Sequence, residues 1–462
     1  MKTYKVWGVL VATAISLALA QPGTAGDTAA AGDTASARAY VGVSLIDGTG
    51  TPLQHDMGVL IQGDRITEVL PSLQLKARLP EGAKLVDASG HYLLPGLIDT
   101  HVHMATVPNR EQAEAYMRRY LYSGITSVRD MAGDMRALAE LARKSRLGKI
   151  PAPDLYYSAL MAGPSFFDDP RPGMAAEGET PGAVPWMQAI TSQTDMEEAV
   201  ALARGTWATG IKIYANLPYA QVRRITKEGH RQGIKVWAHS MVFPAYPSEV
   251  VGAGVDVISH ACRLAFEIAG VRPDEYHHKV ALDFDALDTR SPVLGGIFEQ
   301  MKNQGTVLDA TLWLYANREQ RENEKPKDKR SAGICPSAVA GAMTHFAYEN
   351  GVDVSVGTDG MVPYDAEYPA LFDELEVLAA KADMPPLQVI RSATYVGAKV
   401  LGLEDERGTI EPGKRADLIF LSKNPLEDMA NMRSVVLTVK AGTDYPREAY
   451  TPITKTELGE IN

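Results

Sequence analysis

The sequence predicts an α/β fold, a (β/α)8 TIM barrel with a small β-sandwich domain to which both chain ends contribute. Between residues 96 and 402, eight short apolar runs alternate with longer amphipathic stretches, a pattern typical of parallel strands joined by helical crossovers. Before and after this region, short strand-like runs and turns replace the alternation. Eight strand–helix units are the number that closes a TIM barrel.

The predicted elements follow from this pattern in chain order. The eight barrel strands are expected at 97–102, 125–130, 154–161, 211–214, 236–239, 257–260, 307–312 and 354–357. Helices between them include 112–123, 135–146, 196–207, 219–232, 293–303 and 339–349. The β-sandwich is expected over 38–95 and 403–455, with strands at 39–45, 57–62, 65–70, 84–88, 416–421 and 435–441. The barrel, over 96–402, is therefore inserted between the two parts of the small domain.

Residues 1–20 have the features of a secretory signal peptide. Lys2 and Lys5 precede an apolar run, and small residues at positions 18 and 20 suit cleavage after Ala20. An uncleaved anchor is the alternative. Cleavage would leave a periplasmic or secreted protein with residues 21–37 as a flexible lead-in.

Composition narrows the classes of partner. The 462 residues are 45% hydrophobic and 22% charged, an ordinary globular balance. The formal net charge of −11 argues against nucleic acid or an anionic membrane as partner, and leaves a small-molecule substrate as the expected one. Cys262 and Cys335 could form a disulfide in an exported protein, but the sequence leaves open whether they pair and whether the protein forms a homo-oligomer.

Three long segments follow predicted barrel strands and are expected to project over the active-site face as lids or specificity elements. They are 162–194, 263–292 and 315–337. The first is rich in Pro and Gly and carries Phe166, Phe167 and Trp186 as a candidate apolar wall. The second carries His277 and His278, and the third is highly charged. Ordinary surface insertions are the alternative.

Four histidines and one aspartate stand where predicted barrel strands end. His101 and His103 are separated by one residue, so both imidazoles point to the same side of the first strand, the barrel lumen. His239, His260 and Asp359 close the fifth, sixth and eighth strands. Imidazole and carboxylate together suit Zn²⁺ and similar divalent ions. A single histidine could be a core residue and a single aspartate a helix cap, but the complete set indicates a metal site.

Lys212 lies in a Gly-Ile-Lys-Ile-Tyr run that reads as a short buried strand. An ammonium group is costly to bury without a partner. Lys212 therefore either pairs with a carboxylate or is no longer an ammonium, and the second case would make it a metal ligand.

The chain resembles the amidohydrolase superfamily of metal-dependent hydrolases, and within it the imidazolonepropionase-like and Xaa-Pro dipeptidase-like (prolidase-like) enzymes. The resemblance covers residues from about 38 to 442. Its motifs are those at 94–103, 124–130, 211–214, 357–360 and 408–419, together with His239 and His260.

This resemblance implies a binuclear site with two divalent metal ions, of which zinc is the expected one. The two histidines of the first strand and Asp359 would hold one ion, and His239 and His260 the other. Lys212 would bridge them as N6-carboxylysine; a salt-bridged Lys212 would instead leave a mononuclear site. The metals would activate a water, and Asp359 would accept its proton and deliver it to the leaving nitrogen.

The expected reaction is hydrolysis of a C–N bond, and the resemblance suggests N-acyl amino acids or X-Pro-type dipeptides as substrates. Tyr214 is a candidate donor to the developing oxyanion, and Arg129 and Tyr315 are candidate contacts for a carboxylate or carbonyl. Packing at the barrel mouth is the alternative role of Tyr214. A lactam hydrolase or ring deaminase is the alternative reaction. A non-catalytic binding module is the alternative class, against which the complete ligand set argues.

Overall fold

The structure, a computed structural model, describes residues 37–106, 108–278, 280–331 and 333–459. The predicted signal peptide and all but the last residue of the predicted lead-in lie outside the described residues. Residues 36–462 form one compact unit. Within the described ranges, no helix combines the length and the apolar character needed to cross a membrane.

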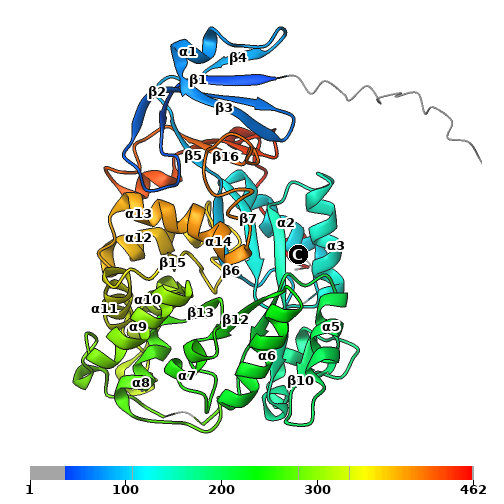
Figure 1. The fold of residues 1–462 in the computed structure, drawn as a ribbon, viewed down its shortest axis with the longest axis vertical. Coiled ribbons are helices and arrows are strands. Elements are labelled where there is room, and N and C mark those ends of the chain that lie inside the picture. Colours follow the sequence, from blue (N-terminus) through cyan, green and yellow to red (C-terminus); the bar gives the residue numbers. More distant parts are fainter. Residues whose placement is uncertain (1–36, 107, 279, 332, 460–462) are drawn as a thin grey trace, which may run out of the picture. The chain divides into compact units, whose positions relative to one another are not determined.

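Eight parallel strands form a nearly closed barrel, which confirms the predicted TIM barrel (Figure 1). Each strand pairs with the next, and the last approaches the first where the Thr100 amide donates to the Val356 carbonyl at 2.8 Å. The barrel strands are β6 (Leu97–Val102), β7 (Ile125–Asp130), β8 (Asp154–Ala162), β11 (Gly210–Ile213), β12 (Lys235–His239), β13 (Val257–Ser259), β14 (Val307–Asp309) and β15 (Val354–Ser355).

Helices occupy the connections and flank the barrel (Figure 1). Several begin at a polar cap: the Asn109, Asp134 and Asp195 side chains accept hydrogen bonds from backbone amides in the first turns of α2, α3 and α5. The helices are α2 (Arg110–Tyr122), α3 (Met135–Arg146), α4 (Pro170–Met174), α5 (Met196–Gly205), α6 (Tyr219–Arg231), α7 (Pro247–Gly252), α8 (Ala265–Ala269), α9 (Pro292–Gln304), α10 (Leu312–Glu324), α11 (Ser337–Glu349), α12 (Leu371–Lys381), α13 (Pro386–Arg391) and α14 (Gly397–Leu401).

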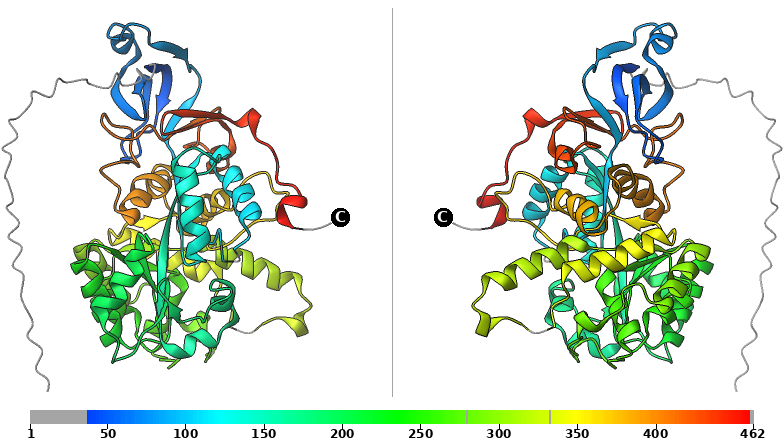
Figure 2. Two further views of the ribbon diagram at one scale, coloured as in Figure 1. Left: turned by 90° about the vertical axis from the view of Figure 1, so that its right-hand side faces the viewer. Right: turned by 90° about the vertical axis from the view of Figure 1, so that its left-hand side faces the viewer.

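Helix α10 corrects the prediction for the seventh strand and the segment after it. A strand to residue 312 and a loop over 315–337 were expected, but β14 ends at Asp309 and α10 spans Leu312–Glu324. The cause is a tertiary cap: the buried Glu374 carboxylate on α12 accepts hydrogen bonds from the Leu312 and Trp313 amides. Figure 2 shows the yellow-green segment that contains α10 projecting from the barrel.

Both chain ends contribute to a second sheet, in which eight strands are joined by hydrogen bonds. Strand β5 lies antiparallel to β16, although more than 300 residues separate them in the chain (Figure 1). The Tyr40 and Phe420 rings, 4.7 Å apart, join the two ends in one core. The strands are β1 (Arg38–Leu45), β2 (Gln54–Gln62), β3 (Arg65–Pro71), β4 (Lys84–Asp87), β5 (Tyr92–Pro95), β16 (Leu418–Leu421), β17 (Val435–Lys440) and β18 (Thr443–Pro446), with α1 (Ser72–Lys76) after β3.

Candidate active site

The six predicted metal ligands all lie at the carboxyl end of the barrel, where the loops meet. They belong to β6, β11 and β12, directly follow β6 and β13, or, as Asp359 does, lie four residues after β15. Four of them are at most 5% exposed, and His103 and Asp359 are partly exposed to a cavity. We call this set the ligand cluster; it comprises His101, His103, Lys212, His239, His260 and Asp359.

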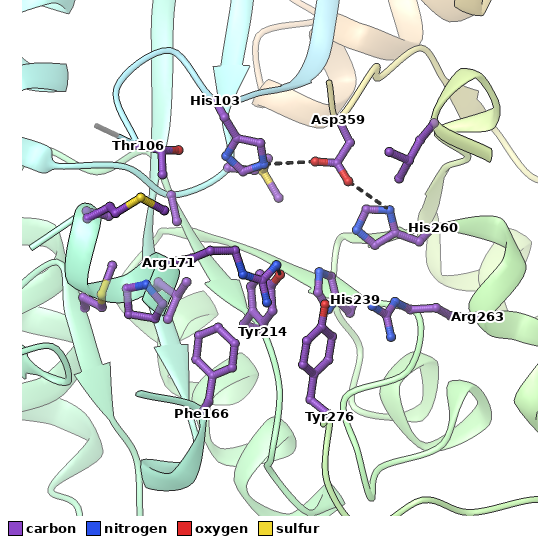
Figure 3. A pocket seen from close by; sticks show the side chains of 18 of the residues that line it. His103, Thr106, Phe166, Arg171, Tyr214, His239, His260, Arg263, Tyr276 and Asp359 are labelled. Atoms are coloured by element: carbon purple, nitrogen blue, oxygen red, sulfur yellow. Dashed lines mark hydrogen bonds and ion pairs between the residues drawn. The ribbon is translucent and has the colours of Figure 1, made fainter. Parts of the chain in front are cut away.

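Asp359 is the centre of the ligand cluster. One ligand atom from each of His101, His260 and Asp359 lies within 4.8 Å of the others. His103 Nε2 lies 3.0 Å from Asp359 Oδ1, and His260 Nδ1 lies 3.8 Å from Asp359 Oδ2 (Figure 3). The His239 ring is 4.7 Å from that of His260. The structure thus brings three of the predicted imidazoles around one carboxylate, with His239 beside His260.

Lys212 is buried in the same lumen, as predicted. Its side chain is 1% exposed, and among the described residues no carboxylate oxygen lies within 4.0 Å of its Nζ. Burial lowers the pKa of Lys212 from 10.5 to about 7, although the charge of Asp359 opposes this shift. Two states of Lys212 were considered, an ammonium paired with a carboxylate and a lysine that is no longer an ammonium. Among the described residues, the structure shows no carboxylate partner for the first.

Three of the four imidazoles in the cluster favour the neutral form that binds metals. The fourth differs: burial opposes the shift, but the hydrogen bond to Asp359 raises the pKa of His103 above 6.5. Burial lowers the pKa of His101 to about 4, and burial holds the pKa values of His239 and His260 well below 6.5. Burial opposes ionisation of Asp359, but His101 and the hydrogen bond from His103 outweigh it and hold the Asp359 pKa well below 3.8. Neutral imidazoles beside an ionised carboxylate are the metal-binding forms of both groups.

Two lone pairs face each other in this arrangement. Asp309 is a carboxylate and can only accept, so the His101 Nδ1–H donates to its Oδ2 at 2.7 Å. The unprotonated Nε2 of neutral His101 then lies 3.5 Å from Asp359 Oδ1, a second acceptor. In addition, His239 Nδ1 is buried without a hydrogen-bond partner. A divalent cation would satisfy the facing His101 and Asp359 atoms, and His239 Nδ1 is free for a cation as well, so the donor set fits metal ions.

Backbone strain is concentrated at this end of the barrel. His260, Thr311 and Asp359 have φ values of 78°, 51° and 47°, in the left-handed region that non-glycine residues avoid. Each follows a barrel strand directly or within a few residues. Such strain costs about 1–3 kcal/mol per residue and is typical of functional sites, where surrounding contacts hold it in place.

A cavity of ≈ 370 Å³ opens beside the ligand cluster, and its two walls differ in chemistry. The apolar wall comes from β7, β8 and the segment after β8: Met131, Ala132, Leu160, Phe166, Pro172, Met174, Ala175 and Met187. The segments after β13 and β14 contribute Arg263, Tyr276, Tyr315 and Arg318, and Arg171 adds a cation on the segment that carries Phe166. Within the described ranges, no carboxylate oxygen lies within 4.0 Å of the Arg263 or Arg318 guanidinium.

Of the three predicted substrate-binding residues, two line the cavity and one does not. Tyr214 and Tyr315 line the cavity, and Tyr214 packs 4.1 Å from the His239 ring and accepts a hydrogen bond from Arg171 at 3.0 Å. Arg129 does not line the cavity: it is fully buried in the barrel, 3.1 Å from Asp309. The expectation of a substrate contact fails for Arg129 because its guanidinium points to a buried carboxylate.

The residues predicted on the long segments after the strands also differ in whether they line the cavity. Of the predicted aromatic wall, Phe166 lines the cavity, but Trp186 donates its indole N–H to the Ala175 carbonyl instead. His277 lies 3.4 Å from Asp169, away from the cavity lining.

The cavity residues missed from the sequence include Arg171, Arg263 and Tyr276 (Figure 3). Arg263 offered a signal, since it stands three residues after His260 at a strand end. The other two lie on long loops without a local pattern, and only the fold brings the Tyr276 ring to within 5.5 Å of the Arg171 guanidinium.

A disulfide joins Cys262 and Cys335, with Cα atoms 6.4 Å apart. Cys262 lies between His260 and Arg263 on the turn after β13, and Cys335 precedes α11. The bond therefore ties the charged segment after α10 to the turn that carries a ligand candidate and the unpaired arginine.

Comparisons with known proteins agree with this fold. A deaminase of 5-methylthioadenosine and S-adenosylhomocysteine from Desulforudis audaxviator is 25% identical over 74% of this chain and 76% of its own. Ochratoxinase from Aspergillus niger is 26% identical over 84% of this chain and 82% of its own. The solved structure of a Xaa-Pro dipeptidase with bound methionine in its active site is similar in fold, with a TM-score of 0.69, 22% identity and coverage of 89% of this chain and 100% of that one.

The model of the amidohydrolase family matches residues 92–271 and 324–443. These ranges make up more than half of the chain and contain most of the barrel and all six residues of the ligand cluster. The chain therefore belongs to the amidohydrolase family, whose members hydrolyse C–N bonds.

Proposed function

We propose that this enzyme is an exported, metal-dependent amidohydrolase that cleaves the amide bond of N-acyl amino acids or X-Pro-type dipeptides. The observation that carries the substrate class is Arg263, a cavity-lining guanidinium with no carboxylate partner within 4.0 Å among the described residues. A carboxylate from the substrate would supply that partner. The apolar part of the cavity lining, which includes Phe166, suits a bulky acyl or prolyl group.

The ligand cluster would hold two divalent metal ions, zinc by preference for imidazole and carboxylate donors. Support comes from the facing lone pairs of His101 and Asp359 and from the unpartnered His239 Nδ1. Lys212 would join as N6-carboxylysine, because carboxylation turns a buried amine without a carboxylate partner into an anion suited to metals. When bound, the metals supply Lewis acidity and lower the pKa of water.

Asp359 moves the proton in this proposal. Its carboxylate is held ionised by neighbouring imidazoles and faces the cavity, so it can accept a proton from the attacking water. The same group can then release the proton to the leaving nitrogen. Tyr214 lies beside His239 and is placed to donate to the carbonyl oxygen. The products are a carboxylic acid and an amine.

Export rests on the sequence of the first twenty residues alone. We propose cleavage after Ala20 and a periplasmic or secreted enzyme. Mass spectrometry of the protein from its native cell should give an N-terminus at Gln21. An intact N-terminus in the mature protein would reject this part.

A ring-directed reaction is the second candidate, because deaminases are among the relatives. The products separate the two proposals. N-acyl amino acids and X-Pro dipeptides should release a free amino acid, detected by mass spectrometry, whereas a deaminase would release ammonia from a heterocycle. Zinc-reconstituted protein that cleaves no amide in such a panel but releases ammonia would replace the first proposal by the second.

Two treatments test the proposed site. Chelation should abolish hydrolysis, and added Zn²⁺ should restore it. Arg263→Met should lower kcat/KM for an N-acyl amino acid by roughly 10- to 100-fold, the value of a hydrogen bond to a charged group, and leave the matching carboxamide substrate unaffected. Arg272→Met is the matched control, since Arg272 lies on the same segment, pairs with Glu249 at 3.2 Å and does not line the cavity. Equal losses on acid and carboxamide would contradict the assigned role of Arg263.

A further inference from the structure

A buried carboxylate outside the predicted ligand set lies directly behind His101. Asp309, at the end of β14, is 0% exposed and is not a member of the ligand cluster. Its Oδ2 atom accepts hydrogen bonds from His101 Nδ1 at 2.7 Å, from Ser259 Oγ at 2.8 Å and from Arg129 Nη2 at 3.1 Å. One carboxylate oxygen therefore joins three barrel strands, β6, β7 and β13.

Arg129 is itself held in place. Its Nε donates to the Thr100 carbonyl, and its guanidinium stacks on the Trp237 ring at 4.6 Å. The side chain is fully buried, so these contacts and the ion pair with Asp309 hold it without help from solvent. A cation fixed in this way keeps a carboxylate beside it ionised and oriented.

The backbone at Gly357 packs against Asp309 and His101. A Cβ added at Gly357 would lie 2.2 Å from Asp309 Oδ1 and 2.8 Å from the His101 Cβ. The chain after β15 therefore packs directly against Asp309 and His101, and only glycine fits there. Neither side chain has room to turn away from the other.

We infer that Asp309 is a positioning residue of the metal site, which holds His101 in the tautomer and orientation that present Nε2 to the ligand cluster. Arg129 and Ser259 hold Asp309 in turn. A carboxylate that accepts the second ring N–H of a metal-binding histidine typically strengthens metal binding, because the imidazole is pre-oriented and more basic. This inference rests on the metal-binding part of the proposed function.

The test is zinc affinity, measured by competition with a chromophoric chelator, for the wild type, Asp309→Asn and Asp154→Asn. Asp309→Asn should bind zinc about 10- to 100-fold more weakly, the usual cost of losing such a partner. Asp154 is also a buried carboxylate beside an arginine, at the opposite end of the barrel. Asp154→Asn should lose stability and keep wild-type zinc affinity, which a general loss of packing would not reproduce.

Wild-type affinity in a folded Asp309→Asn would overturn the inference, as would an equal loss in Asp154→Asn. If Asp309→Asn shows no native near-UV circular dichroism, Ser259→Ala replaces it, because this change removes one donor without stranding a charge. We expect roughly 2- to 10-fold weaker binding, the range for one hydrogen bond, and unchanged affinity would overturn the inference. A wild type that binds no zinc would instead reject the proposed function and this inference with it.

Discussion

The barrel buries charged and titratable groups at both ends, but the two ends differ in how these groups are paired. At the amino end, three cations and two carboxylates form what we call the basal ion cluster: Asp154, Arg407, Arg415, Asp417 and Lys440. Every member has an opposite charge within 4.0 Å, as in the 2.8 Å contact between Lys440 and Asp154. At the carboxyl end, Lys212 has no such partner among the described residues, and His239 Nδ1 has no hydrogen bond.

The difference separates structural charges from functional ones. Lys440 lies on β17 of the second sheet and Asp154 begins β8 of the barrel, so the basal ion cluster ties the two parts of the fold together. Its charges compensate one another within the protein. The ligand cluster leaves donor atoms uncompensated, which is costly unless something else binds them. Burial alone therefore does not mark a site; a buried cation without an ion-pair partner, as at Lys212, is the stronger signal.

The largest expected effect tests the ligand cluster. Asp359→Asn should lower kcat by roughly 10²- to 10⁴-fold, because an amide cannot accept the proton that a carboxylate accepts. Steady-state kinetics with metal content measured in parallel would check this. The same change in the basal ion cluster, Asp154→Asn, should preserve kcat in the fraction that remains folded. Wild-type kcat in fully metallated Asp359→Asn would break the comparison.

Two lysines provide the next test, through urea unfolding of the metal-free protein. Lys440→Met should lower the free energy of unfolding by roughly 3–5 kcal/mol, because it leaves a buried carboxylate with less compensation. Lys212→Met should raise it by about 1 kcal/mol or more, because it removes a buried amine that has no ion-pair partner.

Both lysine variants should be folded by circular dichroism before they are compared. Equal destabilisation would mean that Lys212 has a compensating partner in the metal-free protein, and the distinction between the two clusters would be lost.

The smallest expected effect is a pH dependence. Burial opposes ionisation of Asp154, but Lys440 and Arg407 outweigh it and lower the Asp154 pKa from 3.8 to about 2. A carboxylate with a lowered pKa stabilises the fold above its unfolded value and loses that contribution as the pH falls. Asp154 should thus contribute roughly 2 kcal/mol that disappears between about pH 4 and pH 2.

Denaturant unfolding of the wild type and Asp154→Asn over this range would check the value. The stability difference between the two proteins should narrow as the pH falls. A difference that stays constant would show that the Asp154 charge contributes nothing through its ion pairs.

Much of the barrel was predictable because its strands are buried on both faces and therefore read as apolar runs. The His101 and His103 pair, Lys212, His239, His260 and Asp359 stood out because a polar residue at the end of such a run is unusual. The structure places all six at the carboxyl end of the barrel, and His101, His260 and Asp359 lie close enough to share one ion. Whether two metals bind there and whether Lys212 is carboxylated stay predictions.

The features that escaped prediction depend on contacts between distant parts of the chain. Helix α10 exists where a loop was expected because Glu374, 62 residues after Leu312, caps it. Arg129 was expected at the substrate because it ends a strand, but only the closed barrel brings Asp309 within 3.1 Å of it.

The sequence by itself therefore predicts the local features of this chain. These are the alternation of strands and helices, the metal-ligand residue types at strand ends, and a lysine within a buried strand. Strand periodicity and the cost of burying a charge involve only a few consecutive residues, so they can be recognised from residues adjacent in the sequence. The partners of each charge are a property of the folded barrel. Lys440 meets Asp154 at one end, whereas Lys212 has no ion-pair partner among the described residues at the other. These outcomes depend on side chains that lie far apart in the chain, which no local pattern records.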